Sequence, residues 1–204
     1  MTQEHGAGAQ DPATVLGALQ AEVDRITDPA RTPASWSAGA GGGPGVGPDD
    51  PEYARAKTRA LNMLGARDHS AAELRKKLLG KEHPAEVVDV LIERLVASNL
   101  IDDAAYARAF VRDHRERRRL SVAALKRELT RKGIAEHHAA AAVADLDDES
   151  DLALEVARKK ARTTRTLAYD TRLRRVLGML GRRGFAGSTA MDAARTALDE
   201  YPAE

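Results

Sequence analysis

The stretch Ser70-Ala71-Ala72-Glu73-Leu74-Arg75-Lys76-Lys77-Leu78-Leu79-Gly80 contains the start, the apolar face and the end of one helix. A Ser at the N-cap with Glu73 three positions later is typical of a capping box, which provides partners for two backbone N–H groups. Arg55–Ala66 is predicted as the helix before it. His83-Pro84 is predicted to begin the helix after it, with Pro in the first turn. The core-facing stripe of that third helix is Val87, Val88, Leu91, Ile92, Leu95 and Val96.

The same pattern returns at a spacing of 51 residues, which places Ser121, Leu125 and Leu129 in the positions of Ser70, Leu74 and Leu78. A second step of 51 reaches Val176 and Leu180, where the middle helix lacks the Ser cap and is expected to begin near Asp170. Gly133 and Gly184 are both predicted to stop a helix in the left-handed conformation, each followed by an apolar residue. We therefore predict three tandem three-helix repeats, at 51–101, 102–148 and 149–200.

Repeats of about 50 residues are too small to bury much apolar surface alone, so neighbours should share cores in an elongated array. The helix predicted at 137–146 is rich in alanine and should form a soft junction. Aromatic and β-branched residues are scarce, which favours an all-α fold. Without Cys, the chain has no disulfide or thiolate site, and without a signal peptide or a long apolar run we expect a cytoplasmic protein that does not enter a membrane.

The net charge of +1 conceals an uneven distribution. Residues 1–50 contain two basic and seven acidic residues, a net charge of −5, whereas residues 51–204 contain 30 basic and 24 acidic residues, a net charge of +6. The acidic segment is rich in Gly and Pro and is predicted to be disordered, with a transient helix at 12–27. The repeats are therefore a basic body behind an acidic tail.

Positive charge is concentrated in the second and third repeats, where like charges weaken a fold unless an acidic partner offsets them. We predict that these residues bind phosphates or an acidic protein surface. The alternative is a solvated face whose cations lie near helix C-termini. The predicted basic surface consists of Arg112, Arg115, Arg117, Arg118, Arg119, Lys126, Arg127, Arg131, Lys132, Arg158, Lys159, Lys160, Arg162, Arg165, Arg172, Arg174, Arg175, Arg182 and Arg183.

No catalytic constellation is found. His137 and His138 are adjacent, so on a helix they point about 100° apart and cannot ligate one metal ion. The acidic run at 145–151 lacks the Gly of a calcium loop. Tyr106 and Phe110 are expected in the core, which leaves no platform for stacking bases. We predict no cofactor, no metal and no enzymatic activity, and contacts to nucleic acid through the phosphate backbone.

The segment Asn99-Leu100-Ile101-Asp102-Asp103-Ala104-Ala105-Tyr106-Ala107-Arg108-Ala109-Phe110-Val111 resembles a motif of the RecX family, the regulators of the RecA recombinase. Physically, Leu100 and Ile101 should close the first core, Asp102 or Asp103 should cap the next helix, and Tyr106 and Phe110 should bury its face. The motif is thus a structural joint. Ser70, Glu73 and the stop at Gly133 also match the family pattern, and the resemblance covers about 51–200.

The resemblance implies a curved array of three three-helix repeats that binds in the groove of the RecA–DNA filament. It further implies inhibition of RecA ATPase, strand exchange and co-protease activity in recombination, DNA repair and the SOS response, with some binding of single- and double-stranded DNA. We expect a monomer. The alternative function is an independent DNA-binding regulator, since residues 70–98 could form a helix-turn-helix.

Overall fold

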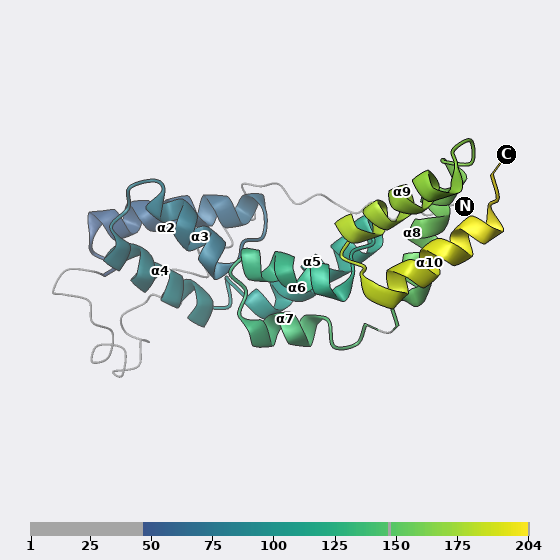
Figure 1. The fold of residues 1–204 in the computed structure, drawn as a ribbon. Coiled ribbons are helices and arrows are strands. Elements are labelled where there is room, and N and C mark those ends of the chain that lie inside the picture. Colours follow the sequence, from purple (N-terminus) through teal and green to yellow (C-terminus); the bar gives the residue numbers. More distant parts are fainter. Residues whose placement is uncertain (1–46, 147, 204) are drawn as a thin grey trace, which may run out of the picture. The chain divides into compact units, whose positions relative to one another are not determined.

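A computed structural model describes residues 47–146 and 148–203, in which helices joined by turns and loops are present and no strand occurs (Figure 1). The all-α prediction is confirmed for these residues. The predicted disordered tail and the helix at 12–27 lie almost wholly outside them, since 1–46 is not described. The helices are α2 (Pro51–Ala66), α3 (Ala71–Leu79), α4 (Ala85–Ala97), α5 (Asp103–Arg118), α6 (Val122–Arg131), α7 (Glu136–Ala142), α8 (Ser150–Arg162), α9 (Tyr169–Arg182) and α10 (Gly187–Glu200).

The chain divides into two compact units, Met1–Asp102 and Asp103–Glu204. The described part of the first unit holds α2, α3 and α4, and the second holds α5 to α10. The sequence spacing predicts three repeats, and the second unit contains two separate hydrophobic cores, one under α5–α7 and one under α8–α10. The residue boundaries assigned to the repeats remain a prediction.

The first unit has one core, to which all three of its helices contribute. Its fully buried members include Tyr53 from α2, Leu74 and Leu78 from α3, and Leu91 from α4. The predicted cap is present, because the Glu73 backbone N–H donates to Ser70 Oγ at 3.1 Å. Together these contacts orient α3 against the other two helices.

Three details of the first unit differ from the sequence prediction. Helix α2 begins at Pro51 and not at Arg55, because Asp50 Oδ1 accepts the Glu52 backbone N–H at 2.8 Å and so caps the helix earlier. Pro84 is the N-cap of α4 and does not belong to its first turn. Val96 is 45% exposed, so the buried stripe ends at Leu95.

The family-like segment contains the end of the first unit and the start of the second. Ile101 is buried in the first core, and Leu100 packs against that core. Helix α5 begins at Asp103. Tyr106 and Phe110, which are expected in the core, are half-buried and pack against the core of α5–α7, and their rings stack along α5 with centroids 6.4 Å apart.

In the second unit the caps and stops predicted from the spacing of 51 are present. Ser121 Oγ accepts the Ala124 backbone N–H at 3.1 Å and begins α6. Gly133 and Gly184 adopt φ of 76° and 89°, and each is followed by a buried apolar residue. Helix α9 begins at Tyr169, close to the predicted Asp170. Helix α7 begins at Glu136 and ends at Ala142, four residues before the predicted end at Leu146.

Candidate anion-binding surface of the second unit

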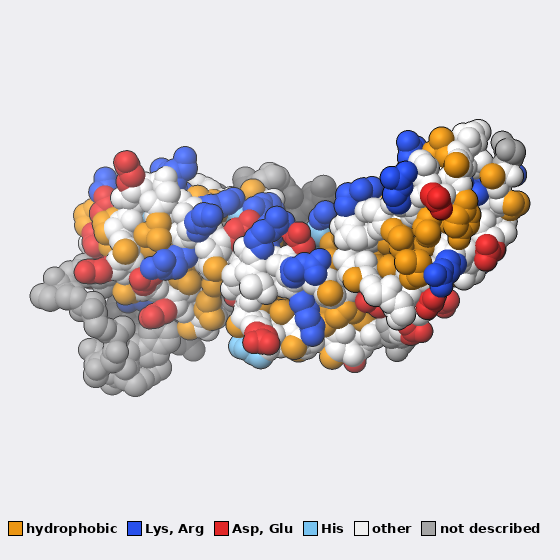
Figure 2. Space-filling view, viewed as in Figure 1, with side chains coloured by type: hydrophobic (Ala, Val, Ile, Leu, Met, Phe, Trp, Pro, Cys, Tyr) orange, Lys and Arg blue, Asp and Glu red, His pale blue; other side chains and the backbone are white. Residues whose placement is uncertain are grey.

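Lys and Arg side chains of the second unit gather over α5 and α6 and continue along α9 (Figure 2). Their exposure separates residues that the sequence treated alike. Most are exposed or half-buried, and each of those either contacts a carboxylate or carbonyl of this unit or extends into solvent. The predicted basic surface is therefore a mixture of structural arginines and available cations, and the two groups have to be separated before a site is defined.

Arg172 contradicts the predicted surface because it is only 1% exposed. It enters the fold from α9 and donates from Nη2 to the Tyr201 carbonyl oxygen, after the end of α10. Arg165 Nε donates to the Pro202 carbonyl oxygen at 3.2 Å, and Arg162 lies over the Tyr201 ring at 5.3 Å from its centroid. These three arginines hold the segment after α10 against the third repeat, so Arg172 has a structural role.

Several exposed arginines form ion pairs within one repeat. Arg117 pairs with Asp113 at 2.6 Å, and Arg131 pairs with Glu128 one turn before it on α6. Arg158 of α8 pairs with Glu200 of α10, and the hydrogen bond from Arg158 lowers the pKa of the Glu200 carboxyl. Such exposed pairs add little to the stability of a fold because water and salt screen them, and a phosphate could displace the carboxylate from the arginine.

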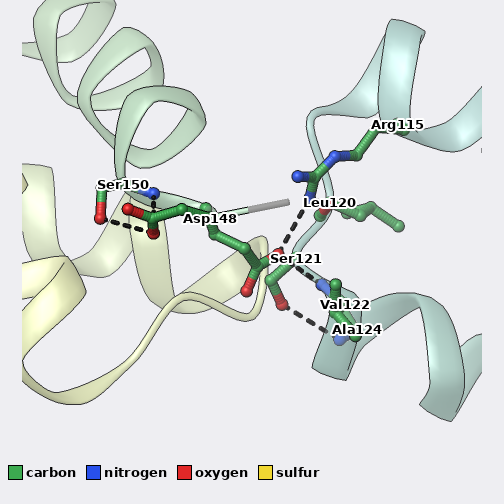
Figure 3. Close-up of polar contacts among 8 residues, drawn as sticks. Arg115, Leu120, Ser121, Val122, Ala124, Asp148 and Ser150 are labelled. Atoms are coloured by element: carbon green, nitrogen blue, oxygen red, sulfur yellow. Dashed lines mark hydrogen bonds and ion pairs between the residues drawn. The ribbon is translucent and has the colours of Figure 1, made fainter. Parts of the chain in front are cut away.

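Another group of arginines connects the second repeat to the third. We call this contact the inter-repeat joint. The residues of the joint are Arg115, Arg118, Arg119, Leu120, Ser121, Val122, Glu149, Glu155, Arg183 and Gly184. Figure 3 shows its first half. Glu149 Oε1 accepts Arg115 Nη1 at 2.9 Å and the Val122 backbone N–H at 2.6 Å, so a carboxylate at the start of α8 caps α6. Arg115 Nη1 also donates to the Leu120 carbonyl oxygen at 3.1 Å.

The second half of the joint brings the ends of α5 and α9 together. Arg183 Nε donates to the Arg118 carbonyl oxygen at 2.9 Å, and the Ser121 backbone N–H donates to the Arg183 carbonyl oxygen at 2.9 Å. Arg119 Nε contacts both carboxylate oxygens of Glu155 at 3.2 Å. These contacts join the two repeats mainly through polar groups. Spacing alone could not have identified them, because their partners lie 27 to 65 positions apart.

Arg174 Nε donates to the Asp170 carbonyl oxygen at 3.4 Å. Eight further cations of the predicted surface have no ion-pair or hydrogen-bond partner for their side chains among the described residues. They extend from α5, α6, α8 and α9, and all but the half-buried Lys160 are exposed. Such groups keep every N–H donor for a ligand, and the guanidinium fork matches the oxygens of a phosphate. These available cations are Arg112, Arg118, Lys126, Arg127, Lys159, Lys160, Arg175 and Arg182.

The first unit presents a different surface. The exposed side of α4 carries Glu86, Asp89 and Glu93, and its Arg94 is turned back over the Tyr53 ring at 5.1 Å. Arg75 of α3 pairs with Asp89 at 2.6 Å, and that hydrogen bond lowers the pKa of the Asp89 carboxyl. The outer side of α4 is therefore acidic, in contrast to the exposed cations of α5, α6 and α9.

A buried histidine is the remaining titratable group of note in the first unit. His69, between α2 and α3, is 4% exposed, with Nδ1 3.5 Å from Glu73 Oε2. Burial, together with the positive charges of Arg67 and Lys77, lowers the pKa of the His69 ring below 6.5. Across the described residues no group of three or more acidic or histidine side chains could hold a metal ion, and no helix there is long and apolar enough to cross a membrane.

Models of the RecX three-helix domains match three segments of the chain. The first domain matches residues 56–95, the second 102–143 and the third 147–193. Together these segments account for more than half of the chain and follow the order of the three sets of helices.

Several proteins named "Regulatory protein RecX" are similar to this chain over most of their length. The "Regulatory protein RecX" of Corynebacterium efficiens is 39% identical over 154 residues, 72% of this chain and 73% of that protein. That of Amycolatopsis mediterranei is 33% identical over 159 residues, 77% of this chain and 91% of its own. A crystal structure of regulatory protein RecX aligns with a TM-score of 0.62 at 26% identity over 72% of both chains. RecX from Lactobacillus salivarius aligns with a TM-score of 0.60 at 22% identity over 74% of this chain and 96% of its own, which supports the fold alone.

Proposed function

This chain belongs to the RecX family of regulatory proteins, and from that premise we propose that it binds the filament of RecA recombinase on DNA and limits RecA activity. The activities concerned are ATP hydrolysis, strand exchange and the co-protease function, in homologous recombination, DNA repair and the SOS response. The protein acts in the cytoplasm as a monomeric binding protein and not as an enzyme.

The observation that supports this role is the set of available cations on the second unit. A filament on DNA presents phosphates and acidic protein side chains together, and both attract arginines that have no carboxylate partner of their own. Duplex and single-stranded DNA would both be bound through their phosphates, so affinity should fall steeply with salt concentration.

The alternative function, an independent helix-turn-helix regulator, is disfavoured by charge. In such a motif the second helix lies in the major groove, which places its outer side close to DNA phosphates. Helix α4 would occupy that place, and its Glu86, Asp89 and Glu93 would be repelled. The observation therefore favours a regulator of the filament over a sequence-specific repressor.

The test is a titration of the RecA DNA-dependent ATPase with the full chain. We expect substoichiometric protein to suppress hydrolysis, and no effect at any ratio would contradict the proposal. The informative variant combines Arg174→Glu with Arg175→Glu, both on exposed positions of α9. Arg172 is left out because its burial means that charge reversal would unfold the third repeat. Weaker inhibition at unchanged helicity is expected.

A further inference from the structure

Two pairs of consecutive arginines, Arg118-Arg119 and Arg182-Arg183, lie at the inter-repeat joint. In each pair one side chain has a partner in the joint and the other has none among the described residues. Arg119 and Arg183, the second member of each pair, are held by the joint, through Glu155 and the Arg118 carbonyl oxygen respectively. Arg118 and Arg182, the first members, are exposed and have no side-chain partner among the described residues. The joint thus fixes the backbone beside two available guanidinium groups that come from different repeats.

We propose that Arg118 and Arg182 form a composite binding site for the phosphates of a nucleic-acid backbone, assembled only when the second and third repeats are joined. The proposal rests on the proposed function in taking DNA as the partner. It goes further by assigning the contact to one place and by making it depend on the joint.

The carboxylates near the joint do not compete for these two arginines. Glu155 is held by Arg119, and Glu149 is held by Arg115 and the Val122 backbone N–H. Glu116 precedes Arg118 by two positions on α5, which places it about 200° away around the helix. The local excess of positive charge is therefore not neutralised within the protein.

Compensation of helix dipoles is the ordinary explanation for arginines at this place, since α5 ends at Arg118 and α9 at Arg182. The hydrogen bonds at the helix ends do not support this explanation for Arg118 and Arg182. Arg183 donates to the Arg118 carbonyl oxygen, and Arg115 donates to the Leu120 carbonyl oxygen. The side chains of Arg118 and Arg182 donate to no carbonyl oxygen among the described residues, so compensation of the helix dipoles does not explain their positions.

The surroundings favour nucleic acid over an acidic protein as the partner. Protein interfaces need an apolar centre, and the apolar residues that follow the two arginine pairs, Leu120 and Phe185, are buried. The residues next to the two pairs in sequence, Arg117 and Gly181, are exposed and are not large apolar side chains. Exposed guanidinium groups are suited to backbone phosphates, whose recognition needs charge and hydrogen bonds but no apolar contact.

Gly184 makes the site sensitive to the geometry of the joint. Its φ of +89° is strained for any other residue, and a Cβ there would lie 2.4 Å from Ser121 Oγ and 2.6 Å from Ala124 Cβ. An alanine would therefore push residues 182–184 away from residues 118–121. This substitution removes no charge, yet it should weaken phosphate binding if Arg118 and Arg182 act together.

The experiment measures binding of the full chain to a fluorescently labelled single-stranded oligonucleotide of mixed sequence, by anisotropy at several salt concentrations and without RecA. For the double variant Arg118→Gln with Arg182→Gln we expect affinity at low salt to fall about tenfold or more. The slope of log affinity against log salt should decrease by about 1.4, because each lost phosphate contact to a single strand contributes about 0.7.

The matched control is Lys76→Gln with Lys77→Gln, two exposed cations of α3 whose loss changes the net charge equally. We expect it to bind as the wild type does. Gly184→Ala, with helicity checked by circular dichroism, should also bind more weakly. Unchanged affinity of the Arg118 and Arg182 variant, or an equal loss in the control, would overturn the proposal.

Two further outcomes separate this site from the proposed function. If the double variant binds the oligonucleotide normally but loses binding to DNA-free RecA, the joint contacts acidic protein and the phosphate site is wrong. If the wild type binds the oligonucleotide through these arginines but never affects the RecA ATPase, the site stands and the proposed function fails.

Discussion

The two units use arginine in different ways. In the first, Arg75 and Arg94 lie at the edge of a single core, and the outer side of α4 is acidic. In the second, arginines connect two cores to each other, and a further set remains available. A count of charges therefore overstates the cations free to bind an anion. The useful distinction is whether a guanidinium group already has a partner.

The largest effects should come from the cores, which the two units build alike. Leu74 and Leu125 occupy equivalent positions 51 residues apart, and both are fully buried. Leu74→Ala and Leu125→Ala should each lower the free energy of unfolding by about 2–5 kcal/mol, from lost burial and the cavity left behind. Chemical denaturation followed by circular dichroism measures this. A cost below 1 kcal/mol at either site would contradict the repeat equivalence.

The inter-repeat joint distinguishes the second unit from the first, and Glu149 lies at its centre. Glu149→Ala removes the acceptor of Arg115 and of the Val122 backbone N–H, and should cost about 1–3 kcal/mol because both donors lose a charged partner in a half-buried place.

The control for that prediction is Glu128→Ala, which also removes the partner of an arginine, but on the exposed side of α6. It should cost about 0.5 kcal/mol or less. Equal costs for the two variants would mean that the joint is no stronger than a surface ion pair.

Local signals explain how much of this could be predicted from sequence. The caps at Ser70 and Ser121 and the stops at Gly133 and Gly184 depend on residues within four positions, so their spacing predicts helices correctly. Leu100 and Ile101 were likewise assigned correctly to the first core.

The candidate surface was harder to predict, because exposure and pairing depend on residues distant in sequence. Arg172 looks like its neighbours on α9, yet it is buried because its partner is a carbonyl oxygen 29 positions away. Arg119 adopts φ of 52° without being Gly, which no local pattern indicated. Glu149 belongs to the acidic run at 145–151, and no local pattern indicates that it caps α6, because Val122 lies 27 positions before it.

A smaller, pH-dependent effect should be specific to the first unit. Burial lowers the pKa of the His69 ring in the folded chain, so below pH 6.5 the unfolded chain binds more protons than the folded one. Stability should therefore be highest above pH 6.5 and decrease as the pH falls toward the folded pKa. Thermal unfolding between pH 7.5 and 5 measures this. His69→Gln should flatten the profile, whereas His137→Gln, at an exposed position of α7, should not.

The smallest effects should come from exposed ion pairs, of which each unit contains one that joins two of its own helices. Arg75–Asp89 in the first unit and Arg158–Glu200 in the second both join two helices, and in both the arginine lowers the pKa of the carboxyl through a hydrogen bond. Arg75→Gln and Arg158→Gln should each raise the pKa of the partner carboxyl toward its ordinary value, which NMR titration of the carboxyl carbon resolves. Because lowered carboxyl pKa values stabilise the fold only above them, any loss of stability should be confined to neutral pH and vanish in acid. A shift of the melting temperature as large as that of Glu149→Ala would show that these exposed pairs matter to the fold as much as the inter-repeat joint does.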